Sequence, residues 1–197
     1  MKPSRGPGRP RSEDSRRAIH EAALRLVARV RYGAITMDAL AAEAGVGKQT
    51  LYRWWSSRAD VMLEVARTLA SEHVVVPDGG SLGKDLTRFV AATFGLLETQ
   101  SPALAALLRG LMAEAQLDPA FLQRLRTGLL EERRAALREL FVRAKGRGEL
   151  RPRWDIELGV DLVFGVLWYR LLVAGAPFDR AAARELADAV TRAATAA

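Results

Sequence analysis

Apolar residues recur three and four positions apart through most of the chain, the spacing that places them on one face of an α-helix. Near the N-terminus two such stripes consist of Ile19, Ala23, Leu26, Val27 and Val30, and of Val61, Met62, Val65 and Leu69. No segment alternates apolar and polar residues strictly, as a half-buried strand would. The pattern therefore predicts an all-α fold.

Capping residues and helix breakers divide this pattern into separate helices. Ser12 predicts the start of a first helix and Gly33 its end, while Ser57 predicts the start of another that runs to about His73. The segment 74–81 contains a proline and two glycines and so predicts a domain boundary. Further helices are expected after it, at about 82–98, 102–115, 119–145, 156–174 and 179–195.

The run from Thr36 to Arg58 predicts a pair of short helices. Thr36 is a good N-cap residue, and the apolar residues after it recur at helical spacing. The sequence Gly45-Val46-Gly47 ends that helix, because glycine adopts the left-handed backbone conformation at little cost. The second helix, from Lys48 to Trp55, turns Leu51 toward the first and leaves the opposite face polar. Two short helices joined by a glycine turn are typical of a helix-turn-helix.

This motif resembles that of the tetracycline-repressor-type (TetR/AcrR) transcriptional regulators. The resemblance rests on residues 36–41 (TMDALA), 44–48 (AGVGK) and 50–55 (TLYRWW), and it extends to Ser57-Arg58. The chain has Trp54 and Trp55 where the family usually has His and Phe. In the family, the His at the position of Trp54 often contacts a DNA phosphate. The indole N–H of Trp54 can still donate a hydrogen bond there.

In a helix-turn-helix, the second or recognition helix lies in the major groove with its N-terminal residues at the base edges. We therefore expect base contacts from Lys48, Gln49 and Thr50, with Tyr52 also in the groove. Phosphate contacts, which set register without carrying sequence information, are expected from Thr36, Arg53, Trp54 and Arg58. The expected partner is double-stranded operator DNA.

Residues 1–11 are rich in Pro, Gly and Arg and cannot form a core, so we expect a flexible basic arm. Arg5, Arg9 and Arg11 are candidates for the minor groove, whose negative potential attracts arginine, and a solubilising tail is the alternative. Residues 1–73 carry 13 basic and 8 acidic side chains, a net charge of +5, against +2 for the remainder. The basic excess thus lies with the helix-turn-helix, as polyanion binding requires.

Composition argues against several other classes of site. The chain has no cysteine, so it holds neither a disulfide nor a thiolate metal site. Its two histidines, His20 and His73, lie far apart, and no phosphate-binding glycine loop or nucleophile motif is present. We therefore expect no metal, no cofactor and no catalysis. No apolar run approaches the ~20 residues that span a bilayer, and no signal peptide follows Met1, which predicts a cytoplasmic protein without a membrane partner.

The segment 162–173 is apolar nearly all round its helix, which indicates burial on more than one side. One side can face its own domain and another a second subunit; the alternative is a monomer with a thick core. The resemblance implies a homodimer in which the last two long helices of each subunit form a four-helix bundle. The interface residues expected on this basis are Val163, Leu167, Leu171, Leu186 and Val190.

The resemblance also implies a pocket for a small molecule in the C-terminal domain. Candidate lining residues are Phe94, Leu97, Leu108, Met112, Phe121, Leu125, Phe164, Trp168 and Tyr169. Trp168 and Tyr169 are the strongest candidates, because a buried indole N–H or phenol needs a polar partner that a ligand can supply. No charged residue points to one class of ligand, so the effector is not identified.

Three parts are thus expected: a basic arm at 1–11, a helix-turn-helix DNA-binding domain with a linking helix at 12–73, and a helical ligand-binding and dimerisation domain at 82–197. We expect a sequence-specific transcriptional regulator, a repressor that leaves its operator when a small hydrophobic ligand moves the fourth helix. A constitutive DNA-binding protein without a ligand is the main alternative, and a helical enzyme is the second.

Overall fold

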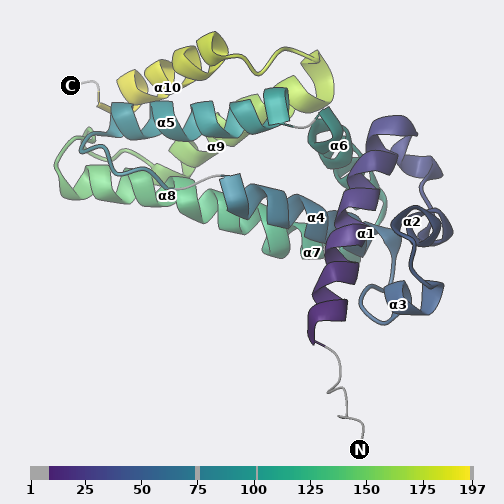
Figure 1. Ribbon diagram of the computed structural model, residues 1–197. Coiled ribbons are helices and arrows are strands. Elements are labelled where there is room, and N and C mark those ends of the chain that lie inside the picture. The colour runs from purple at the N-terminus through teal and green to yellow at the C-terminus, as the bar shows by residue number, and fades with distance from the viewer. Residues whose placement is uncertain (1–8, 74–75, 101, 196–197) are drawn as a thin grey trace, which may run out of the picture.

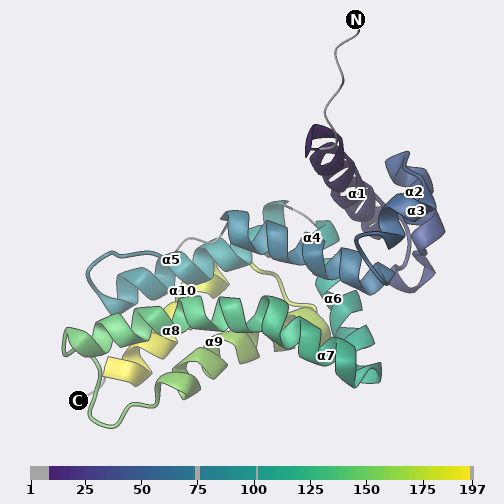
Figure 2. The same cartoon turned by 90° about the horizontal axis from the view of Figure 1, so that it is seen from below.

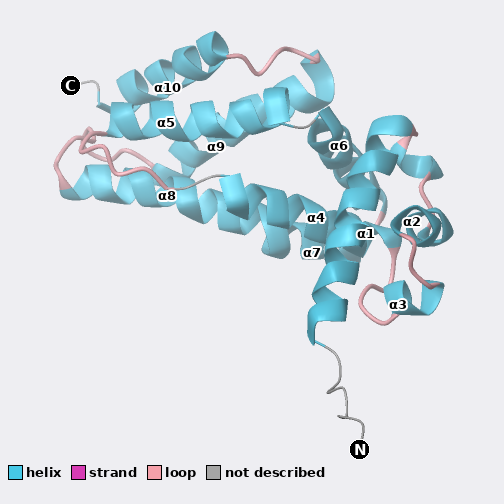
Figure 3. Cartoon of the chain, in the orientation of Figure 1, coloured by secondary structure: helices cyan, strands magenta, loops and turns pink. Residues whose placement is uncertain are grey.

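The computed structural model describes residues 9–73, 76–100 and 102–195, and throughout these ranges the regular structure is helical, with no strand (Figure 3). The predicted all-α fold is therefore confirmed. The N-terminal part contains α1 (Arg9–Arg29), a short 3₁₀ turn (Tyr32–Ala34), α2 (Met37–Ala44), α3 (Lys48–Tyr52) and α4 (Arg58–His73).

The C-terminal part consists of longer helices, three of which contain a π-helical segment. Its elements are α5 (Leu82–Gly95) with the π segment η2 (Leu96–Gln100), α6 (Pro102–Leu117), α7 (Pro119–Leu125), η3 (Arg126–Leu130), α8 (Glu131–Gly146), α9 (Ile156–Tyr169), η4 (Arg170–Ala174) and α10 (Arg180–Thr195). The helix predicted at 119–145 is thus one helical run whose middle turn is π-helical. Such π segments are rare and occur frequently at functional sites.

The predicted capping residues act at several helix starts. The Thr36 hydroxyl accepts a hydrogen bond from the Ala39 N–H, and the carboxylates of Asp118 and Asp155 accept from the first-turn amides of α7 and α9. Gly45 ends α2 in the left-handed conformation, at φ 66°. Helix α1 differs from its prediction, since it begins at Arg9 instead of Ser12. Proline is tolerated in the first turn of a helix, because the N–H that it lacks would have no partner there.

The helices form a long body with the helix-turn-helix at one end (Figures 1 and 2). At the far end α10 packs along α5, with α8 and α9 beneath them. Helix α6 crosses between the two parts and packs against both α1 and α4. Because α4 also contributes Val61, Met62 and Val65 to a core that continues into the C-terminal helices, it belongs physically to both parts.

Candidate DNA-binding surface and internal cavity

The recognition helix α3 has one buried face and one exposed face. Leu51 is fully buried and Trp55, just beyond the helix, is 5% exposed, so both anchor it to the head. Lys48, Gln49, Tyr52 and Arg53 are exposed, and Thr50 and Trp54 are half-buried. The helix ends at Tyr52, earlier than predicted, and Trp54 and Trp55 follow in a turn whose amides donate to the Leu51 carbonyl. Lys48, Gln49, Tyr52 and Arg53 are thus open to solvent in the free protein. Their contacts with DNA stay a prediction.

Two of these side chains have partners within the free protein. The Lys48 ammonium lies 2.6 Å from an Asp38 carboxylate oxygen, joining α3 to α2. Both side chains are about 60% exposed, and ion pairs of that kind contribute little stability. The Arg53 guanidinium lies 5.9 Å from the centre of the Trp54 ring. Neither contact is strong enough to prevent exchange for a base edge or a phosphate.

Glu64 of α4 binds side chains of the DNA-binding head. Its carboxylate accepts hydrogen bonds from Arg16 of α1 and from the Trp55 indole at 3.0 Å, and it lies 2.9 Å from His20 Nε2. Burial raises the pKa of the Glu64 carboxyl, but the hydrogen bonds from Arg16, Trp55 and His20 together outweigh it, so the pKa lies below its ordinary value. One carboxylate thus connects α1, the end of the helix-turn-helix and α4.

We predict that Glu64→Gln lowers the free energy of unfolding at pH 7 by about 1–3 kcal/mol, the scale of hydrogen bonds to a charged group. Because the folded-state pKa is lowered, the carboxylate stabilises the protein above the ordinary glutamate pKa of about 4.3, and this contribution is lost as pH falls through the folded-state value. Urea melts of parent and variant at pH 7, 5, 4 and 3 should therefore converge toward low pH. Glu13→Gln, at an exposed position of α1, is the control; a constant difference at every pH would contradict the role of ionised Glu64.

Arg58 has partners of its own within the free protein. Its Nη1 donates to the carbonyl oxygens of Tyr32 (3.3 Å), Gly33 (2.9 Å) and Ile35 (2.8 Å). Its guanidinium also lies 5.2 Å from the Tyr32 ring centre and 3.8 Å from Glu114. In the free protein the cation therefore supports this loop: it binds the Gly33 and Ile35 carbonyls and shares the Tyr32 carbonyl with the Ile35 N–H. The phosphate contact expected from Arg58 stays a prediction.

Tyr32 joins this loop to α6. Its hydroxyl donates to Glu114 at 2.8 Å, and its ring lies directly on the backbone of Gly110, where a Cβ atom would be 2.2 Å from the ring. Burial, with the neighbouring Glu114 carboxylate, raises the pKa of the Tyr32 phenol well above its ordinary value, so it stays protonated. The segment before the helix-turn-helix thus packs on α6 through the contact between the Tyr32 ring and Gly110, which a side chain at position 110 would prevent.

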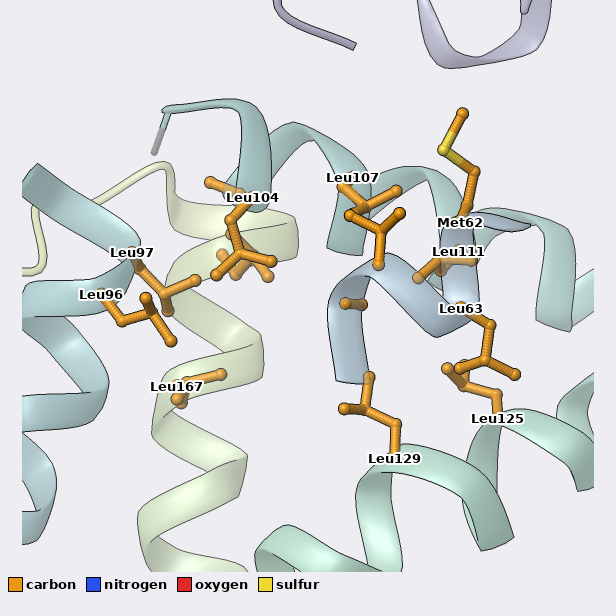
Figure 4. Close-up of a cluster of buried hydrophobic side chains, with 14 of the residues drawn as sticks. Met62, Leu63, Leu96, Leu97, Leu104, Leu107, Leu111, Leu125, Leu129 and Leu167 are labelled. Carbon is orange, nitrogen blue, oxygen red and sulfur yellow. The ribbon is translucent and has the colours of Figure 1, made fainter. Parts of the chain in front are cut away.

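A cavity of ≈ 360 Å³ that is partly open to solvent lies in the C-terminal part, bordered by α4, α5, α6, α8 and α9. Most of its wall is apolar, and Figure 4 shows Leu97, Leu104 and Leu167 on one side of it and Leu129 on the other. Leu96 and Leu97 belong to η2, and Leu129 and Leu130 to η3, so two π segments form part of the wall. Its volume falls within the range typical of small-molecule sites, ~300–1,000 Å³.

The cavity contains four of the nine residues predicted to line it, namely Leu97, Leu108, Phe164 and Trp168. The other five, which lie outside the wall, are Phe94, Met112, Phe121, Leu125 and Tyr169. Phe94 is buried against Phe178, with ring centres 5.0 Å apart, and Tyr169 is 60% exposed on the opposite side of α9. Helical spacing identifies a buried face, but it does not distinguish a core position from a cavity wall.

Sequence reasoning missed the charged part of the wall, which consists of Arg133, Arg134 and Asp161. Adjacent arginines on a long helix are ordinarily solvated, so the sequence carried no sign that this pair faces a cavity. The α4 residues Ala66 and Ala70 were missed as well, because small residues on a helix indicate only close packing.

Four of the five residues predicted at a dimer interface are buried within the single chain. Val163, Leu167, Leu171 and Val190 are at most 4% exposed, and Leu186 is half-buried. The opposite side of α9 and η4 carries an exposed apolar stripe, at positions repeating every three or four residues: Leu158, Leu162, Val166, Tyr169 and Val173. A second subunit therefore finds exposed apolar side chains on a different face of the helix from the one expected, because a helix apolar all round gives no periodicity from which to choose. The interface itself stays a prediction.

Other predicted features are placed as follows. Arg5 lies outside the described residues, and Arg9 and Arg11 lie in the first turn of α1, where their side chains are not described. Within the described ranges no helix is both long and apolar enough to cross a bilayer. Nor do three or more His, Asp or Glu side chains of the described residues gather where they could hold a metal ion.

Comparison with known proteins gives matches over nearly the whole chain. Residues 19–65 match the family model of bacterial regulatory proteins of the tetR family, and residues 76–190 match the tetracyclin repressor-like C-terminal domain. An HTH-type transcriptional regulator of Bacillus subtilis, YdeS, is 32% identical over 91% of this chain and 89% of its own length. The DNA-binding transcriptional repressor TetR of Mycobacteroides abscessus is 31% identical over 91% of this chain and 93% of its own.

Solved structures agree with these sequence matches. The TetR family transcription regulator SCO0332 is 27% identical and superposes with a TM-score of 0.72, covering 90% of this chain and 97% of its own. FadR from Bacillus subtilis, in a complex with stearoyl-CoA, has a TM-score of 0.73 at 15% identity, covering 89% and 97% of the two chains, and so shares the fold. With two family models that together span most of its residues, the chain belongs to the TetR family of transcriptional regulators.

Proposed function

We propose that the protein is a homodimeric repressor that releases its operator when a small apolar molecule occupies the cavity. The observation that carries this proposal is the position of α4, which is the next helix after the recognition helix and contributes Ala66 and Ala70 to the cavity wall. A molecule in the cavity would therefore contact the same helix that supports the DNA-reading head. The relative in Mycobacteroides abscessus described as a repressor supports the direction of control.

Binding to DNA would use the exposed face of α3. Lys48, Gln49 and Thr50 would contact base edges with Tyr52 beside them, while Arg53, Trp54 and Thr36 would contact phosphates. A two-fold dimer presents two such helices about one turn of DNA apart, ~34–36 Å or a multiple, and therefore suits a near-palindromic site. Residues 9–11 at the start of α1 would extend the basic surface toward the minor groove.

Release would be a shift in population between two arrangements of the heads. The ligand would favour the arrangement in which α4 is displaced, and Arg58 and Tyr32 would carry the displacement to the loop before α2. A ligand with equal affinity for both arrangements could not release DNA. An unchanged distance between the two heads with a bound inducer would contradict this mechanism.

Thr50→Ala is expected to relax base preference at one position in each half-site, by about 1–3 kcal/mol of discrimination. Selection from random duplexes with parent and variant, followed by titration of the selected site and its single-base variants, measures this change. Arg53→Ala is the matched control, because loss of a phosphate contact weakens all sequences alike and reduces the salt slope by about one. If Thr50→Ala kept the full preference of the parent, the assignment of base contacts would be wrong.

A further inference from the structure

The wall of the cavity carries an unequal set of charges. Arg134 is matched, because its Nη1 lies 2.6 Å from Asp161 and its Nη2 lies 3.0 Å from Glu157. Arg133 lines the same cavity and forms no ion pair with any described carboxylate. The lining contains two arginines and one aspartate, and apart from Thr93 its other residues are apolar, so it has one positive charge in excess.

Arg133 is held in place by contacts that do not neutralise it. Its Nη1 donates to the Ala70 carbonyl of α4 at 3.3 Å, and its guanidinium lies 5.5 Å from the centre of the Phe89 ring. Its Nη2 is buried and makes no hydrogen bond within the described chain. Burial lowers the pKa of this guanidinium, partly offset by the exposed Glu132 next to it, and an arginine remains charged under these conditions.

An unmatched buried cation is costly, because removal from water carries a penalty that only an opposite charge and further hydrogen bonds offset. Proteins rarely keep a buried N–H group without a partner, and an exception calls for a specific explanation. Here the unpartnered N–H belongs to a residue in the wall of a cavity, so a bound molecule can supply both the charge and the acceptor. Guanidinium groups favour carboxylates and phosphates, whose paired oxygens match their geometry.

We propose that the cavity takes a molecule with an apolar body and a single anionic head, and that Arg133 is the residue that recognises the head. This inference rests on the proposed function and specifies its ligand class. A volume of ≈ 360 Å³ corresponds to roughly a dozen heavy atoms, at about 30 Å³ each. The leucines, Phe164 and Trp168 of the wall suit an aliphatic or aromatic body, and one excess positive charge suits one carboxylate.

The position of Arg133 also connects the head group of the ligand to α4, the helix that supports the DNA-binding head. The same guanidinium that would bind the carboxylate holds the Ala70 carbonyl, near the C-terminal end of α4. A carboxylate that draws the guanidinium toward itself would therefore act directly on α4. The charge of the ligand would then matter for DNA release as well as for affinity.

Decanoate and 1-decanol test the proposal, because they share the same chain and differ in the charge of the head. Calorimetric titration of the purified dimer should show decanoate binding at least about tenfold more tightly than decanol, the scale of charge-assisted hydrogen bonds. Arg133→Gln should abolish this preference and leave decanol affinity nearly unchanged, whereas Arg133→Lys should retain most of it. Arg126→Gln is the matched control, because it removes a positive charge from an exposed position outside the cavity wall, and it should keep the preference.

The outcomes separate this inference from the proposed function. Equal binding of decanol and decanoate to the parent protein, with either compound releasing DNA, would overturn the role of Arg133 and leave a ligand-responsive repressor. Binding of neither compound would overturn the inference, and a screen of neutral apolar compounds that also found no stabilising molecule would count against the repressor itself. The comparison on the parent protein needs no variant, so poor folding of Arg133→Gln would not prevent the test.

Discussion

Replacing Leu162 and Tyr169 with glutamate is expected to leave the protein monomeric and to weaken operator binding by at least about a hundredfold, the scale of avidity lost when two linked sites separate. Both residues lie on the exposed apolar stripe of α9, where they are 39% and 60% exposed. In a two-fold interface each substitution occurs twice, so four carboxylates would have to leave water, at several kcal/mol for each buried ion.

The measurements are light scattering after gel filtration and titration of an operator duplex selected with the parent protein. Leu117→Glu is the control, since Leu117 is 87% exposed at the end of α6, away from the stripe. It should leave both the mass and the affinity unchanged. A double variant that remained dimeric would show that another surface joins the subunits, and the assignment of the α9 stripe would have to be withdrawn.

Gly110→Ala is expected to destabilise the protein by about 1–3 kcal/mol, the usual cost of overpacking, and to disturb the DNA-reading head. A Cβ at this position would lie 2.2 Å from the Tyr32 ring, so the ring must move away from α6. That movement would break the hydrogen bond from Tyr32 to Glu114 and would disturb Arg58, which holds the carbonyls of the same loop. We therefore expect a fall in melting temperature of about 2–10 °C together with weaker operator binding.

Gly146→Ala is the control for the loss of a helical glycine, because nothing lies within 4 Å of a Cβ built there. It should melt at or slightly above the temperature of the parent, since alanine favours helix by about 0.5–1 kcal/mol. Tyr32→Ala and Gly110→Ala together should cost less than the sum of the two single changes, and this double-mutant cycle measures the coupling between loop and α6. If Gly110→Ala melted with the parent and bound the operator equally well, the contact could not connect the two parts.

These two predictions depend on the tertiary structure to different degrees. The expectation that α9 meets a second subunit followed from its apolar character and from the family resemblance, whereas the face that we propose for this contact follows from the exposure of its side chains. The Tyr32–Gly110 contact joins residues far apart in the chain, and neither residue is unusual where it stands in the sequence. Long-range contacts of this kind are set by how whole helices pack, which local patterns do not encode.

The sequence by itself determined the all-α fold, the family and the starts of several helices. These starts could be predicted because capping is a local interaction. Thr36, Asp118 and Asp155 each accept hydrogen bonds from backbone amides two or three residues further along the chain. The buried and open faces of the recognition helix were readable for the same reason, since Leu51 is one turn from Trp55 and the polar side chains lie opposite.

Only the tertiary structure decided which apolar faces met the core, which lined the cavity and which stayed exposed. Leu167 and Tyr169 lie two residues apart on an apolar helix, and one is in the cavity wall while the other is open to solvent. Arg58 and Arg133 look like surface arginines in the sequence, yet one holds a loop and the other lines the cavity. The physical reason is that periodicity reports hydrophobicity along one helix, whereas the environment of a side chain depends on which other helices lie against it.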